Sequence, residues 1–187
     1  IFNFSNRIKF LFIVGPHFKY AHKNIAYFTN SMVGLINRGV DFEIVITLTK
    51  EQLSTSKLWN ESLNSRTKFV GYLNDQEEME KLFSDNTIIV STSIVETLGL
   101  HVIEGIKNGI VPITPNENYA NSVYGNQVFK YELSNDDSLI DCIMNVLEIR
   151  GSHSEHILSI QDDLRRSEME KFSNIVDVFN EVINVQK

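Results

Sequence analysis

The chain has 187 residues, of which 42% are apolar and 22% charged; this is ordinary globular composition and excludes a disordered or fibrous protein. The formal net charge of −7 argues against a general nucleic-acid binder, because affinity for phosphate backbones comes mainly from clustered lysines and arginines. The single cysteine, Cys142, excludes an internal disulfide framework, and no apolar run reaches the roughly 18 residues that a membrane span requires.

Short apolar runs alternate with amphipathic stretches along the chain. We expect strands at 8–14, 42–48, 67–71, 87–90 and 111–114, with a sixth at 127–129. We expect helices that begin after Asn24 and end at Gly39, that begin at a capping box of Asn74 and Glu77, and that cover 100–108, 139–147 and 168–185. The helix at 100–108 is expected to bury Leu100, Ile103 and Ile106, the segment 50–64 to be a loop or a weak helix, and 115–125 a loop.

This alternation of strand and helix predicts an α/β domain in which helices cover both faces of a doubly wound parallel sheet. Open sheets of this kind bind ligands at the carboxyl ends of their strands, in the loops that lead into the helices. The loops at 15–24, 71–75, 91–99 and 115–125 are therefore the candidate binding loops.

The loop at 91–99 carries the clearest signal. It leaves a predicted strand, passes Gly99 and enters a helix, so the backbone N–H groups of Leu98, Gly99 and Leu100 are expected to lack intrahelical partners. The helix dipole adds partial positive charge at this point, and Gly99 lets a ligand approach the backbone closely. We predict a site for phosphate or another anion.

Two glutamates flank the predicted anion site, Glu96 in the loop and Glu104 one turn into the helix. Carboxylates repel phosphate but accept hydrogen bonds from hydroxyl groups. A nucleotide sugar, with phosphates in its middle and hydroxyls at both ends, suits both features. Two simpler interpretations stay open: a glutamate at a helix start can serve only the dipole, and Glu104 can pair with Lys107 at i+3.

The spacing of Glu96 and Glu104 resembles the Glu-x7-Glu pattern of family 4 retaining glycosyltransferases, which have the two-domain GT-B fold. The resemblance extends over about residues 8–184 and also rests on these segments: His22-Lys23-Asn24, Phe69-Val70-Gly71-Tyr72-Leu73, Gly109-Ile110-Val111-Pro112-Ile113 and Glu170-Lys171-Phe172-Ser173. It implies that the chain is the Rossmann-like C-terminal half of a GT-B enzyme, a three-layer α/β/α domain.

The resemblance also implies a role for each matching residue. Glu96 would hold hydroxyls of the transferred sugar, Glu104 would hold the ribose, and Lys23 would neutralise phosphate charge as the leaving group departs. Other donor contacts would come from the phosphate-binding backbone, the loop after the first strand and the segment beside the nucleobase: Thr97, Leu98, Gly99, Leu100, Gly15, His17, Tyr72 and Leu73.

The organisation implied by the resemblance is a donor-binding domain at 8–187, preceded by a linker or added remnant at 1–7. The chain would bind a UDP- or GDP-sugar without a metal cofactor and would be inactive alone. A separate N-terminal domain would bind the saccharide or lipid-linked acceptor. The full-length enzyme would transfer a hexose in polysaccharide biosynthesis and would be cytoplasmic, with peripheral membrane association as a further expectation and no nucleic acid as partner.

One departure from the family pattern keeps a second function open. The family usually has an arginine shortly after the first strand's glycine, whereas here Gly15 is followed by Pro16-His17-Phe18-Lys19, in which His17 and Lys19 are the available cations. The alternative is a non-catalytic nucleotide-binding or regulatory module, a degenerate relative of the glycosyltransferases.

Other polar candidates carry simpler interpretations. His153 and His156 lie at i,i+3 beside Glu155, but without a third ligand a solvated helix surface is expected. Cys142 lies among apolar residues of a predicted helix and is expected to pack as a small hydrophobe. His101 follows the glycine loop, where either a ligand contact or a packing role is open.

Overall fold

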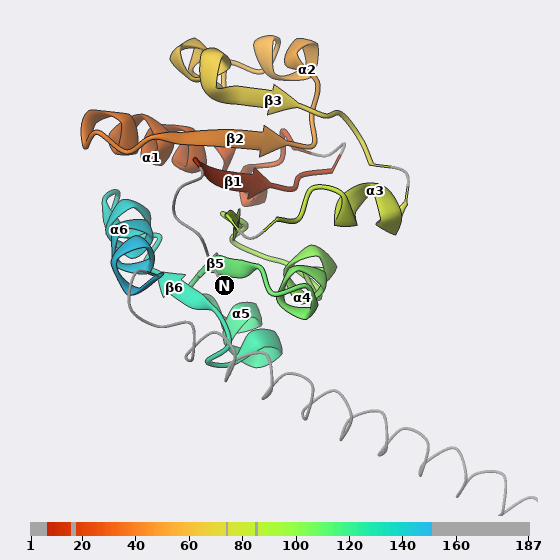
Figure 1. Ribbon diagram of the computed structural model, residues 1–187, viewed down its shortest axis with the longest axis vertical. Coiled ribbons are helices and arrows are strands. Elements are labelled where there is room, and N and C mark those ends of the chain that lie inside the picture. Colours follow the sequence, from red (N-terminus) through yellow and green to blue (C-terminus); the bar gives the residue numbers. More distant parts are fainter. Residues whose placement is uncertain (1–6, 16–17, 74, 85, 151–187) are drawn as a thin grey trace, which may run out of the picture.

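A parallel sheet of six strands organises the residues that the computed structural model describes, which are 7–15, 18–73, 75–84 and 86–150 (Figure 1). The strands are β1 (Ile8–Phe12), β2 (Phe42–Ile46), β3 (Thr67–Phe69), β4 (Thr87–Val90), β5 (Val111–Pro115) and β6 (Phe129–Tyr131). Their order across the sheet is β3-β2-β1-β4-β5-β6, and every neighbouring pair is parallel. The predicted doubly wound α/β fold is confirmed.

The central strands are apolar at successive positions because both faces of the sheet are covered. In β1, Phe10 and Phe12 belong to one apolar cluster, whereas Leu11 between them belongs to the other. In β4, Ile88 and Ile89 divide between the two clusters in the same way. Side chains alternate between the faces of a strand, so a strand buried on both sides reads as a continuous apolar run.

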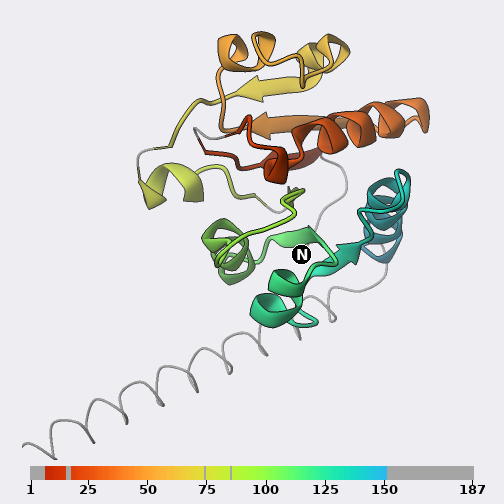
Figure 2. The same ribbon diagram turned by 180° about the vertical axis from the view of Figure 1, so that it is seen from behind.

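Helices form the two outer layers. One face of the sheet packs against α1 (Ile25–Asn37) and α6 (Ser138–Arg150), which also contact each other. The other face packs against α4 (Leu100–Lys107) and α5 (Asn118–Tyr124), as can be followed in Figure 1 and, from behind, in Figure 2. The result is the three-layer α/β/α architecture expected from the sequence.

The first helix has the predicted limits, although its start is held differently. Asn24 precedes α1 in the left-handed conformation, with φ 49°, and its side chain makes no capping hydrogen bond. At the other end Gly39 has φ 77°, its N–H bonds to the carbonyl of Ile36 at 2.9 Å, and the N–H of Val40 bonds to that of Leu35 at 3.1 Å. These two bonds form a Schellman motif that ends the helix where the glycine predicts.

Between β2 and β4 the structure is more regular than the sequence suggests. The segment expected to be a loop or weak helix contains α2 (Lys50–Ser54) and the 3₁₀ helix η2 (Glu61–Arg66). The start of α2 has a capping box, in which Thr49 and Gln52 each bond the other's backbone N–H. The expected cap at Asn74 is wrong by one residue, because Asp75 accepts from the N–H of Glu78 and α3 covers only Gln76–Glu80.

The C-terminal part of the described chain brings two further corrections. The segment 115–125, expected to be a loop, contains α5, and the sixth strand begins two residues later than expected, at Phe129. The expected helix at 168–185 lies outside the described residues, as does the solvated helix surface expected at His153 and His156. Among the residues that are described, we find no helix with the length and apolar character to cross a bilayer.

The strand order fixes where a ligand can approach the sheet. The chain winds outward from β1 to β3 and then returns to the centre with β4, so β1 and β4 are neighbours whose following helices lie on opposite faces. In doubly wound sheets, the loops after two such strands border the crevice in which ligands usually bind.

Candidate active site

The loops that follow β1 and β4 meet at this crevice. A short 3₁₀ helix, η1 (Ala21–Lys23), ends the first loop directly before α1. Two hydrogen bonds join it to the second loop: the N–H of Ile94 donates to the carbonyl of His22 at 2.7 Å, and the hydroxyl of Thr92 donates to the carbonyl of Lys23 at 2.9 Å. The backbone of both loops is thus fixed at the point where β1 and β4 diverge.

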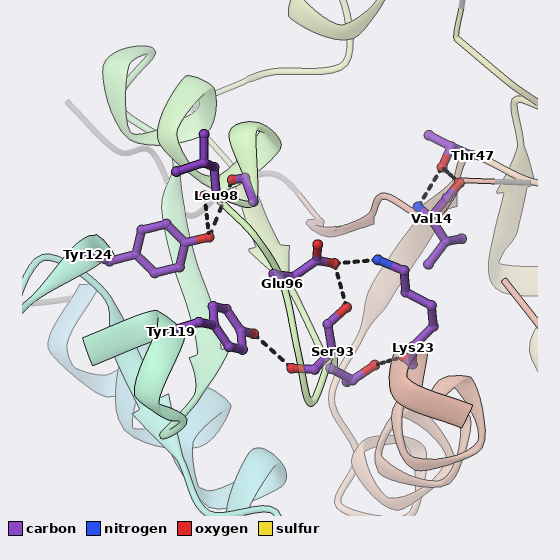
Figure 3. A network of polar contacts seen from close by, with 10 residues as sticks. Val14, Lys23, Thr47, Ser93, Glu96, Leu98, Tyr119 and Tyr124 are labelled. Atoms are coloured by element: carbon purple, nitrogen blue, oxygen red, sulfur yellow. Dashed lines mark hydrogen bonds and ion pairs between the residues drawn. The ribbon is translucent and has the colours of Figure 1, made fainter. Parts of the chain in front are cut away.

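Lys23 and Glu96 form an ion pair across the crevice (Figure 3). Both side chains are largely shielded from solvent, with 19% and 17% of their surfaces exposed. The same carboxylate oxygen of Glu96 accepts a hydrogen bond from the hydroxyl of Ser93 at 2.8 Å. Burial raises the pKa of Glu96, but the hydrogen bonds from Lys23 and Ser93 and the nearby positive charge outweigh it, so the pKa lies below its ordinary value.

His101 lies near this ion pair, in the first turn of α4. Burial lowers the pKa of His101 to about 4, against the opposing attraction of the Glu96 carboxylate and together with the repulsion of Lys23. The imidazole is therefore neutral at neutral pH, and it can donate or accept a hydrogen bond but supplies no charge to an anion there.

The start of α4 presents free backbone donors. Gly99 precedes the helix with φ 54°, and no described residue accepts a hydrogen bond from the N–H of Leu98, Gly99 or Leu100. The side chains of Leu98 and Leu100 are 51% and 60% exposed, so the backbone and not the side chain is what these residues offer. The expectation that Leu100 is part of the buried face is wrong: α4 buries Val102, Gly105 and Ile106, and Leu100 lies on a different side of the helix.

Glu104 follows one turn into α4 and carries a buried carboxylate oxygen. Its Oε2 is shielded from solvent and has no hydrogen-bond partner among the described residues. A buried acceptor without a donor costs about 1–3 kcal/mol, so native structures rarely keep one without a reason. The partner that suits it is a ligand carrying hydroxyl donors.

Three tyrosines hold the loop that joins β4 to α4, and the sequence did not single them out. Each donates its hydroxyl hydrogen to a backbone carbonyl: Tyr131 to Ser91 at 3.0 Å, Tyr119 to Ser93 at 2.8 Å and Tyr124 to Leu98 at 3.0 Å, the last two shown in Figure 3. Burial raises the pKa of Tyr119 to about 12, so its hydroxyl remains a donor at neutral pH. Helical spacing of Tyr119, Ala120 and Tyr124 is the signal that could have identified this helix.

The loop after β1 contributes Gly15. The hydroxyl of Thr47 accepts from the N–H of Val14 and donates to its carbonyl, both at 2.8 Å, which fixes the end of β1 to that of β2. A Cβ added at Gly15 would have no heavy atom within 4 Å among the described residues, so the backbone there is open to a ligand. His17 lies outside the described residues, and the exposed Lys19 places its ammonium 5.7 Å from the ring centroid of Phe18.

No hydrogen bond joins the remaining predicted residues that the structure describes to the ion pair. Tyr72 and Leu73 follow β3, the edge strand, and no hydrogen bond links them to Lys23 or Glu96; the Tyr72 side chain is 67% exposed. Thr97 follows Glu96 in the loop, and its side chain is exposed. Burial raises the pKa of the Cys142 thiol to about 12, in keeping with a packing role. The described part of the chain holds no cluster of three metal-ligating side chains.

Solved structures show where this fold recurs. The chain is similar to a glycosyltransferase from Rickettsia africae ESF-5, with 18% identity and a TM-score of 0.70 over 96% of this chain and 48% of that one. It is also similar to the catalytic domain of cholesterol-alpha-glucosyltransferase from Helicobacter pylori, with 19% identity and a TM-score of 0.65 over 89% of this chain and 99% of that one. A third similarity is to sucrose-phosphate synthase from Thermosynechococcus elongatus, with 13% identity and a TM-score of 0.65 over 91% and 46%.

At these identities the structural similarities establish the fold, which is the Rossmann-like arrangement expected for the C-terminal half of a GT-B enzyme. The chain spans about half the length of the Rickettsia and Thermosynechococcus structures. No curated protein matches it by sequence. Residues 4–159, most of the chain, match the family Glycosyl transferases group 1, and the chain belongs to that family.

Proposed function

We propose that the chain is the donor-binding domain of a retaining glycosyltransferase that transfers a hexose from a UDP- or GDP-sugar. A saccharide or lipid-linked acceptor would bind to a separate N-terminal domain of the whole protein. The observation that carries the proposal is the buried Oε2 of Glu104, which has no hydrogen-bond partner among the described residues. It lies one turn beyond the backbone amides that begin α4. The carboxylate oxygen suits a ligand's hydroxyl donors, and the amides next to it suit an anion.

The Glu104 carboxylate suits a ribose. A ribose presents two neighbouring hydroxyls, and a carboxylate accepts two hydrogen bonds in parallel without further change. A phosphate does not suit the same position, because it would place like charges together. Glu104 therefore selects for the nucleoside end of the donor and not for free phosphate.

The amides of Leu98, Gly99 and Leu100 suit the diphosphate. They have no acceptor in the described structure, they lie at the positive end of the helix dipole, and Gly99 leaves the backbone uncovered. Lys23 adds a full positive charge on the opposite side of the crevice. Together they offer the diphosphate one cation and several oriented dipoles without requiring a metal ion.

Because Lys23 is paired with Glu96, it must leave Glu96 before it can neutralise the charge on the diphosphate. When the bond between the sugar's anomeric carbon and the phosphate oxygen breaks, the electron pair remains on the diphosphate, and negative charge grows there. The anomeric carbon forms its new bond to a hydroxyl oxygen of the acceptor, and the proton of that hydroxyl passes to the leaving diphosphate. Lys23 stabilises this charge only when its ammonium turns from Glu96 toward the phosphate. Glu96 is then free to accept hydrogen bonds from hydroxyls of the transferred sugar.

Calorimetric titration of the 187-residue chain with UDP and with GDP tests the proposal. We expect one of them to bind, and Glu104→Gln to weaken that binding at least about tenfold, because hydrogen bonds to charged groups contribute about 1.5–3 kcal/mol. Glu148→Gln, an exposed position on α6, is the matched control and should leave binding unchanged. Failure of both nucleotides to bind, or equal binding by the two variants, would contradict the proposal.

The second candidate is a module that binds the nucleotide without transfer chemistry. The absence of an arginine after Gly15 favours it, since Lys19 lies over Phe18 and leaves Lys23 as the one predicted phosphate cation within the described part of the chain. The two functions differ in turnover. Release of UDP or GDP from nucleotide sugars by the full-length protein, abolished by Lys23→Ala, supports the enzyme, whereas binding without any turnover supports the module.

A further inference from the structure

Tyr124 lies beneath the start of α4, on the side away from solvent. It is the last residue of α5, and only 2% of its surface is exposed. Its hydroxyl donates to the carbonyl of Leu98 at 3.0 Å and lies 3.4 Å from the carbonyl oxygen of Gly99 (Figure 3). One buried side chain therefore fixes two successive peptide units at the point where the donor phosphates are proposed to bind.

The geometry of the peptide bond gives this contact a functional consequence. In a trans peptide the C=O and the N–H point in opposite directions, and no cis peptide occurs in the described residues. The carbonyl of Leu98 shares its peptide unit with the N–H of Gly99, and the carbonyl of Gly99 shares its own with the N–H of Leu100. The hydroxyl of Tyr124 bonds the carbonyl of Leu98, whereas the carbonyl of Gly99 is held by this hydroxyl together with the N–H of Val102, which donates to it at 2.8 Å. Both carbonyls therefore point inward, and both N–H groups face outward.

We propose that Tyr124 is a positioning residue for the diphosphate, acting through the backbone amides of Gly99 and Leu100. This inference rests on the proposed function, since it assigns a role within the same site. Tyr124 touches no ligand itself. It holds the two donors in the direction that an anion requires before the anion arrives, which removes the ordering cost from the binding step.

The fit between Tyr124 and Gly99 is close enough to explain the glycine. A Cβ added at Gly99 would lie 1.9 Å from the tyrosine hydroxyl oxygen and 3.3 Å from Cζ, and the residue has φ +54°. Both the backbone conformation and the approach of the hydroxyl thus require that position to have no side chain. Burial raises the pKa of Tyr124, so the hydroxyl keeps the hydrogen that it donates.

A purely structural role is the competing explanation, because Tyr124 also belongs to the apolar cluster beneath α4 and α5. The two explanations differ in what the hydroxyl alone contributes. Tyr124→Phe retains the ring and its packing and removes only the hydrogen bond to the loop. Tyr27→Phe is a matched control, because the Tyr27 hydroxyl also donates to a backbone carbonyl, that of Asn135 at 2.8 Å, which lies outside the loop at 91–99.

The test measures nucleotide and nucleoside affinity for the wild-type chain and the two variants. UDP and GDP are the probes for the diphosphate, and uridine and guanosine are the corresponding probes without phosphate. We expect Tyr124→Phe to weaken the nucleoside diphosphate about three- to tenfold, the equivalent of one hydrogen bond, and to leave the nucleoside within twofold. Tyr27→Phe should leave both affinities unchanged.

Each outcome decides between the explanations. A selective loss of diphosphate affinity in Tyr124→Phe supports the positioning role, which a general loosening of the core would not produce. Equal binding by wild type and Tyr124→Phe, or equal weakening of nucleoside and nucleoside diphosphate, overturns it and leaves the proposed function intact. Absence of binding to the wild-type chain overturns the proposed function, and the inference with it.

Discussion

The structure predicts a clear loss of stability when Gly99 is replaced. In Gly99→Ala the new Cβ would lie 1.9 Å from the hydroxyl oxygen of Tyr124, so the tyrosine must move and release the carbonyl of Leu98. An alanine in the left-handed region costs about 1–2 kcal/mol, and the lost buried hydrogen bond about 1 kcal/mol more. We expect a total loss of stability of about 2–3 kcal/mol.

Urea unfolding and thermal unfolding both measure this loss. For a domain of this size about 1 kcal/mol corresponds to roughly 2–4 °C in Tm, so Gly99→Ala should lower Tm on the order of 10 °C. Gly39→Ala is the matched control: Gly39 has φ +77°, but no heavy atom lies within 4 Å of its added Cβ. It should lose only the conformational part, about 1–2 kcal/mol.

The double variant Gly99→Ala/Tyr124→Phe separates the collision from the backbone cost. Removing the hydroxyl leaves Cζ at 3.3 Å as the nearest atom of the ring, so part of the loss should be recovered. Coupled residues of this kind show interaction energies of about 0.5–3 kcal/mol. The reasoning is refuted if Gly99→Ala is no more destabilising than Gly39→Ala, or if its effect is the same with Phe at position 124.

Three further predictions follow from the charges and burial of the described residues. Glu96→Gln removes the carboxylate that competes for Lys23, so calorimetry should show UDP or GDP binding up to about fivefold more tightly, the equivalent of a partly exposed ion pair. The pKa of His101 is about 4 in the folded state and 6.5 in the unfolded state, so the unfolded state binds more protons between these two pH values. The free energy of unfolding should therefore fall as the pH falls from 6.5 toward 4. Urea unfolding across this pH range should show a smaller fall in His101→Gln. The pKa of Cys142 is raised to about 12, so iodoacetamide at pH 7.5 should modify it slowly in the folded protein and rapidly in urea, and equal rates would contradict its burial.

The architecture was predictable because the central strands are buried on both faces. Sequences such as Phe10-Leu11-Phe12 place apolar side chains on both sides at once, which restricts them to the interior of a covered sheet. The limits of α1 were equally accessible, since Gly39 ends it by a motif that requires a left-handed residue. Element limits failed where two equivalent signals overlap: Asn74 with Glu77 and Asp75 with Glu78 offer the same cap one residue apart.

The site was predictable only in part. Glu96, Glu104 and Lys23 could be identified by their place in a pattern, but the direct contact between Lys23 and Glu96, which are 73 positions apart, depends on the strand order. The tyrosines of α5 and β6 were missed for another reason. Their hydrogen-bond partners are backbone carbonyls. Every residue has such a carbonyl, so the sequence does not distinguish Tyr119 and Tyr124 from other apolar helix residues; only the position of the loop does.

The two glutamates of the candidate site differ in their hydrogen-bond partners when no ligand is bound, and this difference suggests an order for donor binding. Oε1 of Glu96 accepts hydrogen bonds from both Lys23 and Ser93, whereas Oε2 of Glu104 has no partner in the described structure. A ligand that reaches Oε1 of Glu96 must displace Lys23. Under the proposed function, the nucleoside end of the donor would bind at Glu104, and Lys23 would leave Glu96 when a phosphate is present to receive the ammonium.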